Sequence, residues 1–142
     1  MMRKVSIAVV LVLAVAGCWQ QEINGWDFGP LQGQWAGTFT YAGDFHLWQV
    51  LIEQHGGNHS GRFEGSHVTT LPDSTTVKGA LAHGAYYPPT VDMTFVITLP
   101  DSPIYCEYHG QHQDPYYRIV GRISCLQADT TVVDQDMQLL GT

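Results

Sequence analysis

From Gly33 to its end, this 142-residue chain is a succession of short stretches separated by turn residues. Glycine, proline, asparagine and aspartate favour turns because glycine reaches positive φ, proline fixes φ, and Asp or Asn bonds its own backbone. None of the stretches has an apolar period of 3.6 residues, so the spacing predicts an all-β domain. The stretches are 33–41, 45–55, 60–67, 75–83, 90–99, 103–112, 117–126 and 130–140.

Three of these stretches show which side chains face the interior. Strict alternation of apolar and polar residues indicates a strand with one buried face. Stretch 90–99 follows it most clearly and stretch 130–140 follows it well, whereas stretch 45–55 is apolar on both faces, which predicts a cover on each. The expected inward residues are Val91, Met93, Phe95, Ile97 and Leu99, then Val133, Met137 and Leu139; the two faces of 45–55 carry Trp48, Val50 and Ile52, and Phe45, Leu47 and Leu51.

Eight consecutive strands with short turns predict an eight-stranded antiparallel up-and-down barrel. Closure into a barrel removes the exposed edges that an open sheet must protect. A β-sandwich of two sheets is the alternative. A barrel of this size has an interior that is either filled by side chains or able to hold one small ligand.

The cysteine positions test this pattern. If stretches 103–112 and 117–126 form a hairpin around Asp114-Pro115, Cys106 lies opposite Cys125. The same register places Tyr108 opposite Ile123 and His112 opposite Ile119. The basic and then apolar N-terminal segment predicts export to an oxidising compartment. We therefore expect a Cys106–Cys125 disulfide rather than two buried thiols.

The N-terminus has the layout of a secretory signal. Arg3 and Lys4 precede an uncharged apolar run that begins at Val5 and ends near Ala16. This run is about a dozen residues long, whereas a bilayer-spanning helix needs about 20. A short basic start followed by a short apolar run and small residues is typical of a cleaved signal peptide.

This signal ends in Val15-Ala16-Gly17-Cys18, which resembles the bacterial lipobox. In lipoproteins of that family the cysteine sulfur receives a diacylglycerol, the signal is cut before it, and the new amine is acylated with a fatty acid such as palmitate. The resemblance implies a signal peptide over 1–17 and lipidation of Cys18. Together with the strand pattern, it predicts a lipidated tether over 18–32 and a barrel domain over 33–142. An ordinary cleaved signal with a chance cysteine is the alternative.

The anchor and the charge define the expected surroundings. Trp19 follows the cysteine in place of the aspartate that resembles an inner-membrane retention signal, which favours the outer membrane of a two-membrane bacterium. Two of the six Lys and Arg lie in the signal, leaving four against 13 Asp and Glu, a net charge of −9 with histidines neutral. Such a surface disfavours nucleic acid and anionic lipid headgroups, so membrane contact is expected through the lipid on Cys18.

Gly33-Gln34-Trp35, at the start of the first stretch, resembles the G-x-W that opens lipocalins and related calycin barrels. The chain lacks their T-D-Y-like motif and the arginine of the last strand that covers the tryptophan, so the resemblance lies in architecture and in these residues. The resemblance to lipocalins implies that the barrel binds a ligand. The first functional hypothesis is therefore a binder of a small apolar or amphipathic molecule, held between Trp35, Phe39, Phe63, Met93, Phe95 and Ile97.

The second hypothesis is an envelope interaction module with a filled barrel, including the protease-inhibitor type. It would contact an envelope protein through Tyr86, Tyr87, Tyr116 and Tyr117, which the turn residues place at loops. Exposed aromatic side chains at loops are candidates for partner contacts. Packing of the same tyrosines over the barrel mouth is the alternative.

The sequence indicates neither an enzyme nor a metal or cofactor protein. G-x-S-x-G and S-x-x-K are absent, as is H-E-x-x-H. His55 and His59 flank one turn and can approach each other, whereas His109 and His112 would face opposite sides of a strand. We therefore expect no catalytic and no metal-binding residues, and histidines exposed to solvent in turns and strands.

Overall fold

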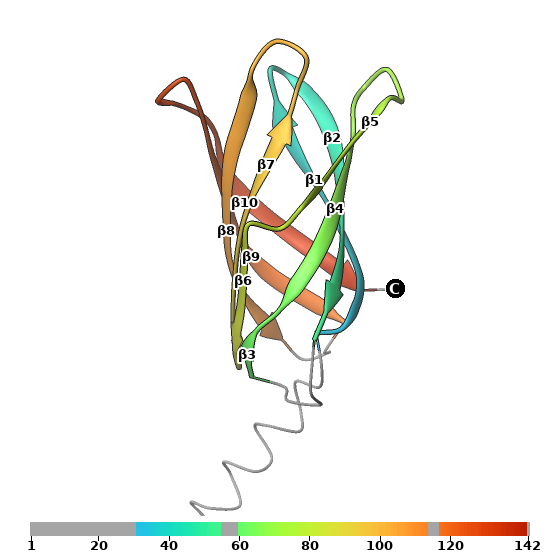
Figure 1. Ribbon diagram of the computed structural model, residues 1–142. Helices are drawn as coiled ribbons and strands as arrows, with labels where there is room; N and C mark the ends of the chain where they lie inside the picture. The colour runs from blue at the N-terminus through green and yellow to red at the C-terminus, as the bar shows by residue number, and fades with distance from the viewer. Residues whose placement is uncertain (1–30, 55–59, 114–116, 142) are drawn as a thin grey trace, which may run out of the picture.

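The computed structural model describes residues 31–54, 60–113 and 117–141, and this part of the chain is all-β (Figure 1). No helix in it is long and apolar enough to cross a membrane. Cys18 and the rest of the predicted signal and tether up to residue 30 lie outside the described residues. The strands are β1 (Gly33–Tyr41), β2 (Asp44–Glu53), β3 (Gly61–Arg62), β4 (Glu64–Thr70), β5 (Thr76–Ala80), β6 (His83–Tyr87), β7 (Thr90–Thr98), β8 (Pro103–Gln113), β9 (Arg118–Gln127) and β10 (Thr130–Gly141).

All ten strands belong to one antiparallel sheet that curls around a core (Figure 1). The order is β3-β6-β7-β8-β9-β10-β1-β2-β4-β5, so most neighbours in the sheet are also neighbours in the chain. The first and last strands pair with each other, with Trp35 opposite Gly141. The described strands therefore form one curled sheet, not the two sheets of the sandwich alternative.

The described chain has ten strands where the sequence predicts eight, because the regions 60–67 and 75–83 each contribute to two strands. Phe63 alone separates β3 from β4, and Leu81 and Ala82 separate β5 from β6. The ladder partners change at these points, which a period-2 pattern in a single segment does not reveal. Three main-chain hydrogen bonds lie at the two junctions: Phe63 N to Gly84 O at 3.1 Å, Leu81 N to Gly65 O at 2.9 Å, and Ala82 N to Thr94 O at 2.9 Å.

The two ladders on either side of the junction between β5 and β6 are offset by one residue, as at a β-bulge, and this junction is called the bulge below. Arg62 pairs with Ala85, whereas Ser66 pairs with Ala80, so the β5–β6 side holds one residue more than the β3–β4 side. Residues 82–83 are both exposed, which breaks the alternation of inward and outward side chains. An extra residue of this kind bends its strand and disturbs the ladder locally.

The core contains the side chains that the alternation predicts. Those of β7 and β10 are buried, with Leu99 partly buried at the edge of the core. On β2 the inward face is buried, but the outward face is exposed among the described residues, so nothing described covers it. The buried residues are Val91, Met93, Phe95, Ile97, Val133, Met137, Leu139, Trp48, Val50 and Ile52; the exposed residues are Phe45, Leu47 and Leu51.

The β8–β9 hairpin has the predicted register. Cys106 lies opposite Cys125, and a disulfide joins them with an S–S distance of 2.15 Å. Tyr108 pairs with Ile123, and His112 pairs with Ile119. The turn residues and the period-2 alternation were therefore sufficient to align these two strands.

Candidate functional site

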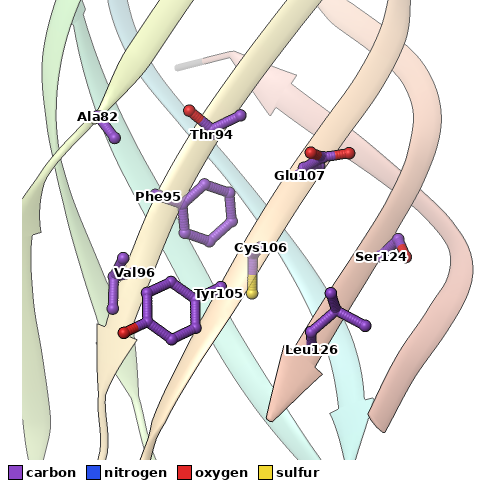
Figure 2. A pocket seen from close by; sticks show the side chains of 9 residues that line it. All are labelled: Ala82, Thr94, Phe95, Val96, Tyr105, Cys106, Glu107, Ser124 and Leu126. Carbon is purple, nitrogen blue, oxygen red and sulfur yellow. The ribbon is translucent and has the colours of Figure 1, made fainter. Parts of the chain in front are cut away.

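A hollow of about 350 Å³ lies on the outer face of the sheet over β7, β8 and β9 (Figure 2). Its walls are the outward side chains of these strands, closed on one side by Ala82 at the bulge. Phe95 and Cys106 contribute from below, because their own side chains point toward the interior. The lining residues are Ala82, Thr94, Phe95, Val96, Tyr105, Cys106, Glu107, Ser124 and Leu126.

The outward side chains that line this outer hollow form two cross-strand rows. In one row Tyr105 lies between Val96 and Leu126, which is an apolar surface across three strands. Tyr105 is 57% exposed and Leu126 is 44% exposed. In the other row Glu107 lies between two hydroxyl residues of β7 and β9. Neighbouring residues across strands contact one another, so the hollow offers an apolar strip beside a single carboxylate.

A histidine lies between two carboxylates beside the outer hollow. His109 Nδ1 is 2.5 Å from Asp92 Oδ1, and its Nε2 is 3.5 Å from Glu107 Oε2. The hydrogen bond with Asp92 raises the pKa of His109 above its usual value. The side chain of His109 is well exposed, so solvent weakens these interactions.

Arg122 continues the same row on β9. Its Nε donates to Asp134 at 3.0 Å and its Nη1 donates to Asp136 at 2.9 Å. Two carboxylates therefore engage the only guanidinium in this row. The carboxylates beside the hollow, which belong to Asp92, Glu107, Asp134 and Asp136, outnumber the cationic groups, so this part of the outer face is acidic.

A second hollow, also of about 350 Å³, lies on the other side of the bulge. Ala82 borders both hollows, so the junction between β5 and β6 lies between them. Sequence reasoning missed this second hollow, because no rule of alternation locates the bulge at residues 82–83. The second hollow is lined by Arg62, Phe63, Glu64, Leu81, Ala82, His83 and Gly84.

The residues predicted to hold an apolar ligand all lie in the interior, and the structure packs them into one core. Phe95 stacks on Trp48 with ring centroids 4.5 Å apart and an interplanar angle of 22°. Tyr86 and Tyr108 fill further space among them. The six predicted ligand residues have side chains that are 4% exposed or less. They are Trp35, Phe39, Phe63, Met93, Phe95 and Ile97.

A group of buried polar atoms lies within this core, between β2 and β4. Trp48 Nε1, both ring nitrogens of His67 and Thr69 Oγ1 have no hydrogen-bond partner among the described residues. Burial lowers the pKa of His67, which favours its neutral form. Its ring lies over Gly79, where an added Cβ would be 2.8 Å from Nε2. Sequence reasoning missed this cluster, because the inward direction of β4 was not assigned.

The tyrosines predicted at loops do not behave alike. Tyr86 belongs to β6 and is fully buried with its ring in the core, which excludes it as a partner contact and favours the packing alternative. The Tyr86 hydroxyl lies 2.9 Å from His112 Nδ1, and burial raises the pKa of Tyr86 to about 12. Tyr87 and Tyr117 are exposed, which partner contact requires, and Tyr116 lies outside the described residues.

The histidines also depart from the expectation of solvent exposure. His46, His67 and His112 are buried because they occupy inward positions of their strands. His112 is buried while His109 is exposed, which confirms that the two face opposite sides of β8. The predicted pair His55 and His59 lies outside the described residues, and within the described ranges no group of three His, Cys, Asp or Glu is arranged to hold a metal.

Fold and surface together define an all-β protein with a curled antiparallel sheet, a packed core and a hollowed outer face. No family model matches the sequence, and no curated protein matches it. The fold by itself does not define a function, because one fold carries many.

Proposed function

We propose that this protein is a lipid-anchored binding protein of the bacterial envelope that holds a protein partner on its outer face. One observation carries this proposal: the residues expected to line a ligand cavity are packed against one another, while the outer hollow is open and contains exposed Tyr105 and Leu126. Tyrosines at the centre of an interface commonly supply much of its binding energy. The function is binding rather than catalysis.

The proposal includes closure of the sheet into an eight-stranded up-and-down barrel. In this interpretation β3 and β4 act as one bent strand, and β5 and β6 act as another. It is supported by the three main-chain hydrogen bonds at the junctions and by the pairing of β1 with β10. A closed barrel has no free edge to receive a partner's strand, so a partner has to bind through side chains on its faces.

The anchor in this proposal is lipid on Cys18, after removal of residues 1–17. Support comes from the sequence Val15-Ala16-Gly17-Cys18 behind a short apolar run, and Trp19 favours the outer membrane. Two or more acyl chains give stable attachment, since each buried CH₂ contributes about 0.8 kcal/mol. A Cys18→Ser variant should leave the membrane fraction; continued fractionation with membranes would refute lipidation.

Site-specific photo-crosslinking tests the partner-binding proposal. A photoreactive phenylalanine derivative at position 105 should yield a discrete crosslinked product in intact cells. The matched control is the same group at position 45, because Phe45 is 78% exposed but lies on β2, away from the outer hollow. No product at either position, or the same product at both, would contradict binding at this hollow.

A second candidate function is storage or transport of a small molecule in the interior. The unpartnered atoms of Trp48, His67 and Thr69 favour it, because buried polar groups normally have a partner. Native mass spectrometry tests it directly. A mass excess that disappears on denaturation, and is absent from a His67→Leu variant, would support this candidate; a bare mass in the wild-type protein would count against it.

A further inference from the structure

We propose that the outer hollow selects a basic partner by binding an arginine or lysine side chain of a peptide segment. The aliphatic stem would lie along the apolar row of Val96, Tyr105 and Leu126, and the cationic head would meet Glu107. This inference rests on the proposed function and specifies the chemistry of the partner.

The apolar row fits the stem of a long basic side chain. Lysine and arginine bury their methylene groups on apolar surfaces while the charged head remains near water. Tyr105 is exposed beside Leu126, and its ring also offers a face to a guanidinium, which aromatic rings attract. The hollow of about 350 Å³ gives this side chain a defined place rather than a flat surface.

The carboxylate of Glu107 is accessible to an incoming cation. Its side chain is 64% exposed, and it lies on the same outward face of β8 as Tyr105, two residues along the strand (Figure 2). The contact with His109 is 3.5 Å long and uses only Oε2. This distance exceeds the 2.7–2.9 Å typical of charge-assisted bonds, so a guanidinium or ammonium can form the stronger contact.

The charges around Glu107 favour a cation over an anion. Sheet register defines two rows, one running from Thr94 through Glu107 and Ser124 to Asp134, the other from Asp92 through His109 and Arg122 to Asp136. These rows carry four carboxylates, one guanidinium and one imidazole, an excess of three negative charges with the imidazole neutral and of two with it protonated. The net charge of the chain, −7, has the same sign and attracts a basic partner at long range.

Fluorescence anisotropy of short labelled peptides on the full-length protein tests this inference. The probe is a pentapeptide of alternating leucine and arginine, and its matched control has glutamate in place of arginine. We expect binding of the arginine peptide that weakens with added salt, and no measurable binding of the glutamate peptide. Equal affinity for the two peptides, or no binding of either, would overturn the inference.

Two charge variants locate the binding site. Glu107→Gln should weaken binding of the arginine peptide about two- to fivefold, as expected for an exposed ion pair. Glu53→Gln removes the same charge from an exposed position on β2 and should leave the affinity unchanged. An equal loss in both variants would mean that only net charge attracts the peptide, which contradicts a defined site.

Two apolar variants test the stem contact separately. Tyr105→Ser should weaken binding several-fold, while Phe45→Ser, which removes an exposed aromatic ring from β2, should have no effect. If the peptides fail but photo-crosslinking at position 105 still yields a product, the partner-binding proposal stands and its partner is not basic. If the crosslink is also absent, both proposals fall.

Discussion

His67 provides a direct test of whether the interior is filled. It is 1% exposed, its ring centroid lies 5.1 Å from that of Phe95, and neither ring nitrogen has a partner among the described residues. If the interior holds nothing besides protein, the imidazole is a buried polar group with unmade hydrogen bonds. Replacement by leucine should then stabilise the fold.

The expected gain follows from two opposing terms. A buried unsatisfied polar group costs about 1–3 kcal/mol, and His67→Leu removes it. The leucine side chain is shorter than that of histidine and leaves a gap over Gly79. This cavity lowers the free energy of unfolding by about 24 cal/mol per Å³ and offsets part of the stabilisation. We expect a net stabilisation of about 1 kcal/mol at pH 8, or about 4 °C in Tm.

The same substitution should reduce the sensitivity of the fold to acid. Burial lowers the folded-state pKa of His67 below the ordinary 6.5, so between these two values the unfolded chain binds a proton that the folded chain does not. Stability therefore falls as the pH drops below 6.5, by up to about 1.4 kcal/mol per pH unit. His109 acts in the opposite direction, because its raised pKa adds stability at low pH that is lost as the pH rises, but its exposure makes that effect small.

Urea unfolding followed by tryptophan fluorescence at pH 8 and pH 5.5 measures both effects. His67→Leu should be more stable than wild type at both pH values, with the larger difference at pH 5.5. His83→Leu, at an exposed position, is the control and should change neither. Destabilisation of His67→Leu by more than about 1 kcal/mol at pH 8 would refute the reasoning, because it would mean that His67 hydrogen-bonds a molecule held in the interior.

Three further predictions concern the core and the hairpin. Tyr108→Phe should lower the free energy of unfolding by about 1 kcal/mol, since its buried hydroxyl donates to a main-chain carbonyl of β10 at 2.8 Å; an unchanged urea midpoint would contradict this. Gly84→Ala should destabilise by about 1–3 kcal/mol in the same assay, because the new Cβ would lie 2.4 Å from the ring of Phe63. Replacing Cys106 and Cys125 by alanine should cost about 3 kcal/mol, given their separation of 19 residues, and should make Tm insensitive to dithiothreitol; a variant as stable as the oxidised protein would be inconsistent with a bond between them.

The parts of the fold that could be read from the sequence are those governed by local alternation and turns. The inward face of β7 and the register of Cys106 opposite Cys125 follow from a period of two and from turn position, and both are confirmed. The sequence left the direction of Tyr86 open between partner contact and packing, because a tyrosine beside Pro88-Pro89 has the local pattern of a loop. Its direction depends on where β6 starts, which the bulge near Ala82 sets.

The candidate site could not be predicted because it combines residues that are distant in the chain. Val96, Tyr105 and Leu126 meet only through the pairing of three strands, and Ala82 reaches the same hollow through the bend of a fourth. The predicted hairpin register, with Cys106 opposite Cys125, already places Tyr105 opposite Leu126, but no sequence pattern places Val96 or Ala82 beside them. Electrostatic pairing of His109 and Arg122 with carboxylates depends on the same cross-strand contacts.

The sequence by itself determined the all-β class, the inward side chains of the regular strands and the β8–β9 pairing, because each depends on residue spacing within one or two adjacent segments. Tertiary structure alone decided that the predicted ligand residues pack against one another, that His67 is buried without a described partner, and that the outer face is hollowed beside Glu107. These features depend on volumes, bends and pairings summed over the whole sheet. The spacing of apolar residues within a single strand contains no information about these features.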